Sequence, residues 1–172
     1  MKRVSAYIGV LPVECINIRR NKYRVRWDIR PDDRDYGEGV DENCITFVEQ
    51  EFDHRPTLDE IQSVILAWHN EQIDQKIVSG FKWRGFDVWL STENQFNYKA
   101  AYDLAVQTNG ASLPVTFKFG STLEPLYYTF ESLADISDFY VSAMTHINNV
   151  LVDGWKKKDA IDWTQWTQYL IN

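Results

Sequence analysis

Residues that usually supply covalent stability or membrane anchoring are scarce in this sequence. It holds two cysteines, Cys15 and Cys44, which is too few for the disulfide framework of a small secreted domain. We interpret both as reduced thiols on core strands. The chain also has no run of about 18 apolar residues, so no membrane-spanning helix is expected.

Catalytic and metal-binding motifs are missing as well. The three histidines, His54, His69 and His146, include no pair spaced to supply two metal ligands from one helix face. The chain has no GxSxG or HExxH motif and no glycine-rich phosphate-binding loop. We therefore expect no catalytic residue, no bound metal and no cofactor. A cryptic hydrolase is kept as the third hypothesis, because carboxylates far apart in the sequence can meet in a folded chain.

Acidic residues are concentrated in the polar loop predicted at 31–43. Hard cations such as Ca²⁺ need several oxygen ligands held by a tight loop. The EF-hand pattern is not met, because counting from Asp33 places Gly37 at the fifth position, and Arg34 would repel a cation. A solvated loop, partly neutralised by neighbouring arginines, is favoured, and ion binding by this loop is left open.

The net charge is −7, and the excess of acid lies after Pro56. A protein with a net negative charge repels phosphate backbones and anionic membrane surfaces, which argues against nucleic acids and membranes as partners. The predicted strand 23–30 is nevertheless rich in arginine and carries Tyr23 and Trp27, as do strands that bind single-stranded nucleic acid. Strand alternation places the aromatics on one face and the arginines on the other, so they would not meet on one ligand. A small nucleic-acid-binding module is therefore the runner-up.

The spacing of apolar residues predicts an α+β fold. Strands are expected at 13–18, 23–30 and 45–53, and a helix from Thr57 to about Val78 follows. The later elements are expected to be a hairpin at 81–90, a helix from Thr92 to Asn109, a hairpin at 115–130, a long helix from Ser132 to a break at Gly154, and a short helix from about Asp159.

This order divides the chain into two predicted lobes. Residues 1–79 form an N-terminal βββα lobe of antiparallel strands plus a helix. Residues 80–172 form a lobe of two hairpin–helix units, ββαββα, followed by a short C-terminal helix. The chain also has the length of one domain, so one compact unit is the alternative.

One stripe of the long helix is predicted to be buried. Its apolar residues follow one another in alternating steps of three and four, as on the core-facing side of an amphipathic helix. They are Leu133, Ile136, Tyr140, Ala143, Ile147 and Val150.

Aromatic residues make up 15% of the chain, and a group of them lies near its C-terminal end. Trp163, Trp166 and Tyr169 follow three lysines at 156–158. Large aromatic side chains near a chain end either pin that end to the core or dock a partner. The first explanation is favoured, and the second makes these three residues the candidate interface.

Residues 81–163 resemble an uncharacterised domain family of phage and prophage tail-fibre and tail-assembly proteins. The resemblance is carried by FKWRGFDVWLSTENQFNYKAAYDLA at 81–105, LPVTFKFG at 113–120 and GWKKKDAIDW at 154–163. In this family a Trp-bearing hairpin and a second aromatic strand pair precede a long helix with a Lys-x-x-Ile type of ending, which Lys158 and Ile161 fit.

The resemblance implies a non-enzymatic structural or assembly role in the tail, the baseplate, the fibre or another part of the virion. It implies other virion or tail proteins as partners, and structural proteins of this kind usually form symmetric homo-oligomers. The expected location is the cytoplasm of the bacterial host and then the virion, without membrane attachment. The family assigns no functional residue that could be carried over to this chain.

Overall fold

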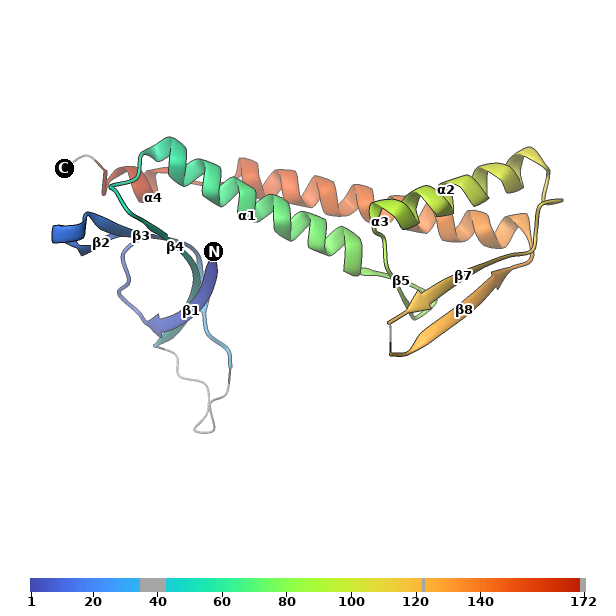
Figure 1. Cartoon of the computed structure of the whole chain (residues 1–172), viewed down its shortest axis with the longest axis horizontal. Helices are drawn as coiled ribbons and strands as arrows, with labels where there is room; N and C mark the ends of the chain where they lie inside the picture. The colour runs from blue at the N-terminus through green and yellow to red at the C-terminus, as the bar shows by residue number, and fades with distance from the viewer. Residues whose placement is uncertain (35–42, 122, 171–172) are drawn as a thin grey trace. The chain divides into compact units, whose positions relative to one another are not determined.

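The computed structural model describes residues 1–34, 43–121 and 123–170 (Figure 1). Antiparallel strand pairs and helices alternate along the chain, which confirms the predicted α+β class. No helix in the described ranges is long and apolar enough to cross a bilayer.

The chain divides into two units. Unit 1 contains Met1–Trp68 and Ala160–Asn172, and unit 2 contains His69–Asp159. The predicted boundary between residues 79 and 80 differs from this division for two reasons. Helix α1 (Leu58–Ser79) contributes residues to both units, and the C-terminal segment belongs to unit 1 rather than to the second lobe.

Unit 1 is built on a four-stranded sheet with the order β1–β4–β3–β2, in which every neighbouring pair is antiparallel. The strands are β1 (Lys2–Tyr7), β2 (Val13–Asn17), β3 (Lys22–Pro31) and β4 (Cys44–Phe52). Strand β1 was missing from the sequence prediction. A short 3₁₀ helix, η1 (Ile18–Arg20), and the left-handed Asn21 connect β2 to β3. Cys15 is an exposed free thiol, so its predicted place in the core is wrong.

Strand β3 follows the predicted alternation only as far as Trp27. Val25 and Trp27 are buried as expected, with 0% and 3% of their surface exposed. The register of β3 against β4 then shifts between Trp27 and Arg30, where Asp28 has a positive φ of 50°. Such a bulge turns the following side chains to the other face, and Ile29 is consequently 42% exposed. Arg26, predicted to lie outside, is also buried.

One face of this sheet forms the core of unit 1. The first part of α1 supplies Ile61 and Ile65 to it, and the short helix α4 (Thr164–Thr167) supplies Trp166. A capping box starts α1, because the Thr57 backbone N–H donates to Glu60 and the Glu60 N–H donates to the Thr57 hydroxyl.

Unit 2 has the predicted order of two hairpin–helix units. Its elements after α1 are β5 (Phe81–Trp83), β6 (Phe86–Val88), α2 (Thr92–Gln107), β7 (Val115–Gly120), β8 (Pro125–Phe130) and α3 (Leu133–Asp159). The core is aromatic: the ring of Phe139 on α3 lies 5.3 Å from Trp83 and 5.0 Å from Tyr98. Phe139 is fully buried although the predicted stripe of this helix left it out.

Helix α3 continues through Gly154, so the predicted break at this residue is wrong. The glycine serves close packing instead. A Cβ at position 154 would lie 2.3 Å from Ile73 Cδ1 and 2.4 Å from Ile73 Cγ1, both on α1. Glycine is the residue that allows this approach between the two helices, and it costs the helix only about 1 kcal/mol of intrinsic propensity.

Candidate functional site

The C-terminal aromatic group belongs mainly to the core of unit 1. Trp166 is 2% exposed, and its Nε1 donates to the backbone oxygen of Arg26 at 3.0 Å. Trp163 and Tyr169 are half-buried against the same core, with the Trp163 ring 5.6 Å from that of Trp166. The prediction that Trp166 offers exposed surface to a partner is therefore wrong, because its indole is already enclosed. The three residues pin the chain end.

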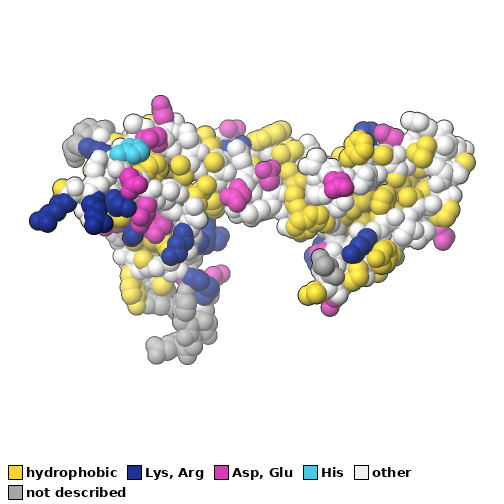
Figure 2. Space-filling view, in the orientation of Figure 1, with side chains coloured by type: hydrophobic (Ala, Val, Ile, Leu, Met, Phe, Trp, Pro, Cys, Tyr) yellow, Lys and Arg dark blue, Asp and Glu magenta, His cyan; other side chains and the backbone are white. Residues whose placement is uncertain are grey.

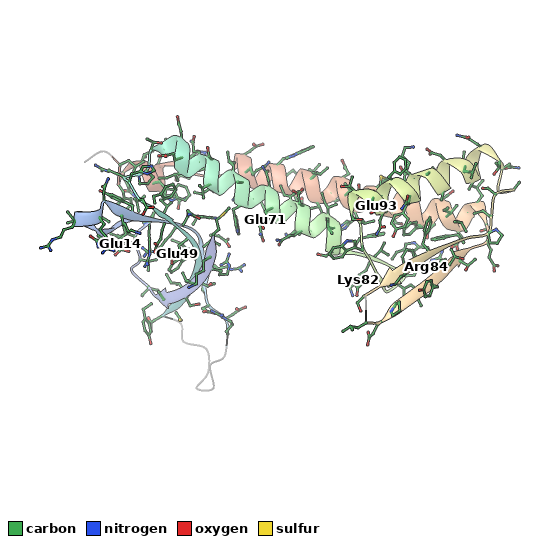
Figure 3. The ribbon with its side chains drawn as sticks, in the orientation of Figure 1. Glu14, Glu49, Glu71, Lys82, Arg84 and Glu93 are labelled. Atoms are coloured by element: carbon green, nitrogen blue, oxygen red, sulfur yellow. The ribbon has the colours of Figure 1, made fainter. Side chains whose placement is uncertain are left out.

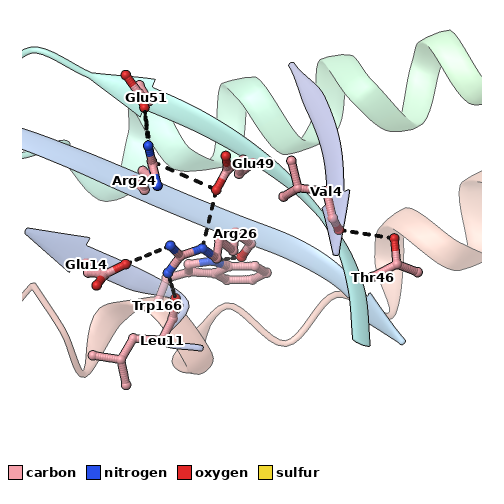
Figure 4. Close-up of polar contacts among 9 residues, drawn as sticks. All are labelled: Val4, Leu11, Glu14, Arg24, Arg26, Thr46, Glu49, Glu51 and Trp166. Carbon is pink, nitrogen blue, oxygen red and sulfur yellow. Dashed lines mark hydrogen bonds and ion pairs between the residues drawn. The ribbon is translucent and has the colours of Figure 1, made fainter. Parts of the chain in front are cut away.

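Arg24 and Arg26 of β3 lie in a ladder of ion pairs on the other face of the sheet (Figure 4). Arg26 binds Glu14 at 2.6 Å, donates to the Leu11 backbone oxygen at 3.1 Å, and lies over the ring of Phe47. Its Nε is 3.5 Å from a carboxylate oxygen of Glu49. The guanidinium is thus held by carboxylates from both neighbouring strands, β2 and β4.

Arg24 extends the same ladder. It binds Glu51 at 2.7 Å and lies 3.9 Å from Glu49. The hydrogen bond to Glu51 raises the pKa of Arg24 above its ordinary value. Since Arg24 is paired within the sheet, it offers little net positive charge to a phosphate backbone. The ladder therefore weakens the nucleic-acid interpretation of this strand.

A second polar cluster surrounds Arg84 at the turn between β5 and β6 of unit 2 (Figure 3). Its guanidinium lies 4.2 Å from the Trp83 ring centroid and pairs with Asp135 at 2.8 Å and with Asp138 at 3.3 Å. The Tyr128 hydroxyl donates to Asp135, and burial raises the pKa of Tyr128 above its ordinary value. These contacts tie the hairpin to the start of α3. Both carboxylates are engaged by donors of their own unit.

The histidines and the start of the acidic loop are also engaged in local structure. His54 contacts Glu60 at 2.8 Å, and His146 contacts the Lys76 backbone oxygen at 3.2 Å. Asp32 accepts hydrogen bonds from Ser5 and Arg34. Within the described ranges, no group of three or more His, Cys, Asp or Glu could hold a metal ion. Most of the loop at 31–43, on which ion binding was left open, lies outside those ranges.

Exposed hydrophobic side chains are prominent in unit 2, and Figure 2 shows many of them gathered over its α2 side. The exposed residues include Trp89, Phe96, Leu104, Val141 and Trp155. Large exposed apolar areas on a folded protein usually mark contacts with other macromolecules. These residues are candidates for such a surface.

One set of these residues follows a regular pattern along α3. We call it the α3 seam and define it as Val141, Met144, Asn148, Leu151 and Trp155. Val141 is 57% and Trp155 51% exposed, Asn148 is exposed, and Met144 and Leu151 are half-buried. The seam borders the buried stripe of the same helix, and its half-buried member Met144 packs against the core that contains Ile136, Phe139 and Ala143. Its exposed apolar members are Val141 and Trp155.

A groove of about 350 Å³ lies along the first half of the seam. Val141, Met144 and Asn148 line it together with Thr145, Tyr140 and the α2 residue Tyr102. The rings of Tyr102 and Tyr140 stack with centroids 4.5 Å apart and an interplanar angle of 14°. The lining holds no carboxylate and no histidine, so the groove suits an apolar or aromatic side chain better than a reacting substrate.

The α3 seam was missed in the sequence prediction, which considered one apolar stripe of this helix. A second series in steps of three, four, three and four starting at Val141 was the available signal. Comparisons with protein-family models, curated proteins and solved structures give no match to this chain. The resemblance to phage tail-associated domains therefore stays a prediction.

Proposed function

We propose that this chain is a non-enzymatic phage or prophage structural or assembly protein that acts through protein–protein contacts. The α3 seam is the observation that carries the proposal. Two large apolar side chains, Val141 and Trp155, are about half exposed on one helix face, beside a groove lined by two stacked tyrosines. Leaving such groups in water is unfavourable by roughly 25 cal/mol per Å² of apolar surface, which a partner would recover.

The polar clusters support the same proposal, because their arginines form ion pairs within their own unit. Arg26 and Arg84 are each held by carboxylates of their own unit. The runner-up, a nucleic-acid-binding module, needs one coherent basic face, and the ladder on β3 works against it. The third hypothesis, a hydrolase, needs a pocket in which ionisable groups converge. The groove on α3 is lined by no carboxylate, histidine, lysine or arginine.

The proposed partners are other virion or tail proteins and further copies of the chain, first in the bacterial cytoplasm and then in the virion. Quantitative mass spectrometry of purified particles from the phage or induced prophage that encodes the chain tests this. A fixed copy number per particle, or particles arrested before tail completion when the gene is deleted, is the expected result. Normal particles that form without the chain and never contain it would contradict the proposal.

A further inference from the structure

The α3 seam has the spacing of a helix that packs against another helix. Its five residues follow one another in steps of three, four, three and four, the repeat of positions a and d in a coiled coil. Val141, Asn148 and Trp155 then occupy successive a positions, while Met144 and Leu151 occupy the d positions between them.

The two most exposed apolar members of the seam are placed symmetrically about Asn148, whereas Met144 lies four residues before Asn148 and Leu151 three residues after it. Val141 and Trp155, its two most exposed apolar members, lie seven residues before and after Asn148. A two-fold axis at Asn148 would pair α3 with an antiparallel copy of itself, so that Trp155 of each chain faces Val141 of the other. An amide group carries both donors and acceptors, so the two Asn148 side chains can hydrogen-bond to each other.

The groove and the tryptophan complement each other in this arrangement. Side chains on an α-helix point back toward its N-terminus, so each Trp155 indole would lean toward the centre of the seam. In the antiparallel copy that direction leads from Val141 toward Met144, which is where the groove lies. The stacked Tyr102 and Tyr140 offer aromatic walls to an incoming indole.

The charges at the ends of α3 favour the same orientation. Asp138 lies near its start and Lys156 near its end, on the same side of the helix because about five full turns separate them. The side chain of Asp138 is 55% exposed although it contacts Arg84. An antiparallel pair brings Asp138 of one chain near Lys156 of the other and also opposes the helix dipoles.

We propose that the partner of the α3 seam is a second copy of this chain, packed antiparallel across a two-fold axis at Asn148, with each Trp155 in the groove of the other copy. The inference rests on the proposed function, because it names the partner of the same surface. The seam spans only about four helical turns, which is short for a permanent dimer. The dimer is therefore expected to dissociate in the micromolar range.

Sedimentation equilibrium of the full chain across the micromolar range is the first test. The expected mass rises with concentration toward twice the 20.2 kDa of one chain. Trp155→Ala should raise the dissociation constant by more than about 100-fold, because each dimer loses two aromatic anchors. Trp89→Ala is the matched control, since Trp89 is 54% exposed but lies outside α3, and it should leave the dissociation constant within about twofold.

Cysteine cross-linking tests the orientation, in a chain whose own Cys15 and Cys44 are replaced by serine. In the antiparallel dimer, Val141→Cys chains should form disulfides with Trp155→Cys chains but not with each other. The two copies of residue 141 would be about 21 Å apart along the helix, far beyond the reach of a disulfide. Asn148→Cys, at the axis, should link to itself.

The outcomes separate the inference from the proposed function. A wild-type chain that stays monomeric through the micromolar range overturns the second copy as partner, while particle mass spectrometry still tests the structural role. Self-linking of Val141→Cys without linking to Trp155→Cys overturns the antiparallel arrangement. Equal weakening by Trp155→Ala and Trp89→Ala overturns the assignment to the α3 seam.

Discussion

The close approach of α1 and α3 within unit 2 predicts that a glycine-to-alanine substitution inside a helix will not stabilise the protein. Gly154→Ala in an exposed helix would stabilise the protein by about 1 kcal/mol through helix propensity. Here the new methyl group would meet Ile73 Cδ1 and Cγ1 at 2.3 and 2.4 Å, and Ile73 is itself buried. Overpacking of this kind costs about 1–3 kcal/mol. The net expectation is a destabilisation of about 0–2 kcal/mol.

Removal of the Ile73 side chain should turn Gly154→Ala into a stabilising substitution. Ile73→Ala removes both clashing carbons and leaves Ile73 Cβ, which lies 3.7 Å from the new methyl group, an ordinary contact. Ile73→Ala alone should cost about 2–5 kcal/mol as a core truncation. Added to it, Gly154→Ala should stabilise by about 1 kcal/mol, because only the helix propensity remains. The coupling between the two positions is then about 1–3 kcal/mol.

Urea unfolding of the four proteins in this double-mutant cycle, followed by circular dichroism, measures the coupling. Far-ultraviolet spectra of the folded variants should be unchanged, because α3 remains continuous. If Gly154→Ala stabilises the wild-type chain as much as it stabilises the Ile73→Ala chain, close packing is not the reason for the glycine. A helix that ends at Gly154, as the sequence alone predicted, would instead make Gly154→Ala destabilising in both chains, because the position after a helix end favours glycine.

Three further perturbations test the cores and caps. Trp166→Phe should destabilise unit 1 by about 1–3 kcal/mol, measured by urea unfolding, because it leaves the buried Arg26 carbonyl without its indole donor. Ser91→Ala should cost about 1 kcal/mol in the same assay, since the Ser91 hydroxyl caps the first turn of α2. Hydrogen bonds from the backbone N–H and hydroxyl of Thr57 hold the pKa of Glu60 below its ordinary value. The contribution of ionised Glu60 to the stability of the fold is therefore complete above its unfolded-state pKa, and it is lost as pH falls through the folded-state pKa. Glu60→Gln should therefore reduce the acid-side loss of thermal stability, and an unchanged pH profile would contradict this.

Local chemistry explains which parts of the fold were predictable. The capping box at Thr57 and Glu60 fixes the start of α1 by contacts within three residues, and the sequence alone was sufficient there. The bulge at Asp28 depends on the pairing of β3 with β4, so the residues near Ile29 in the sequence did not predict that Ile29 is exposed. Arg26 was assigned to the surface because its carboxylate partners, Glu14 and Glu49, come from other strands.

The role of Gly154 also depended on a distant residue. Glycine ends helices when the backbone must turn, and it permits close packing when another helix approaches. A glycine in the sequence is compatible with both roles. For Gly154 the close contact with Ile73, a residue far away in the chain, shows that the role is close packing. The same limit applies to Trp166, whose indole is enclosed by a strand that lies near the other end of the sequence. Contacts of this range cannot be read from local spacing.

The candidate site was difficult to predict for a related reason. Helix α3 carries two apolar stripes, and the prediction chose the one that starts at Leu133. Periodicity identifies a stripe that needs a partner, but it does not say whether the partner is the rest of the chain or another molecule. Phe139 and Ala143 meet the core of their own unit, whereas Val141 and Trp155 remain about half exposed. A helix of ordinary amphipathicity needs one apolar stripe, so the exposed Val141 and Trp155 are the apolar residues of α3 for which the core of unit 2 gives no use.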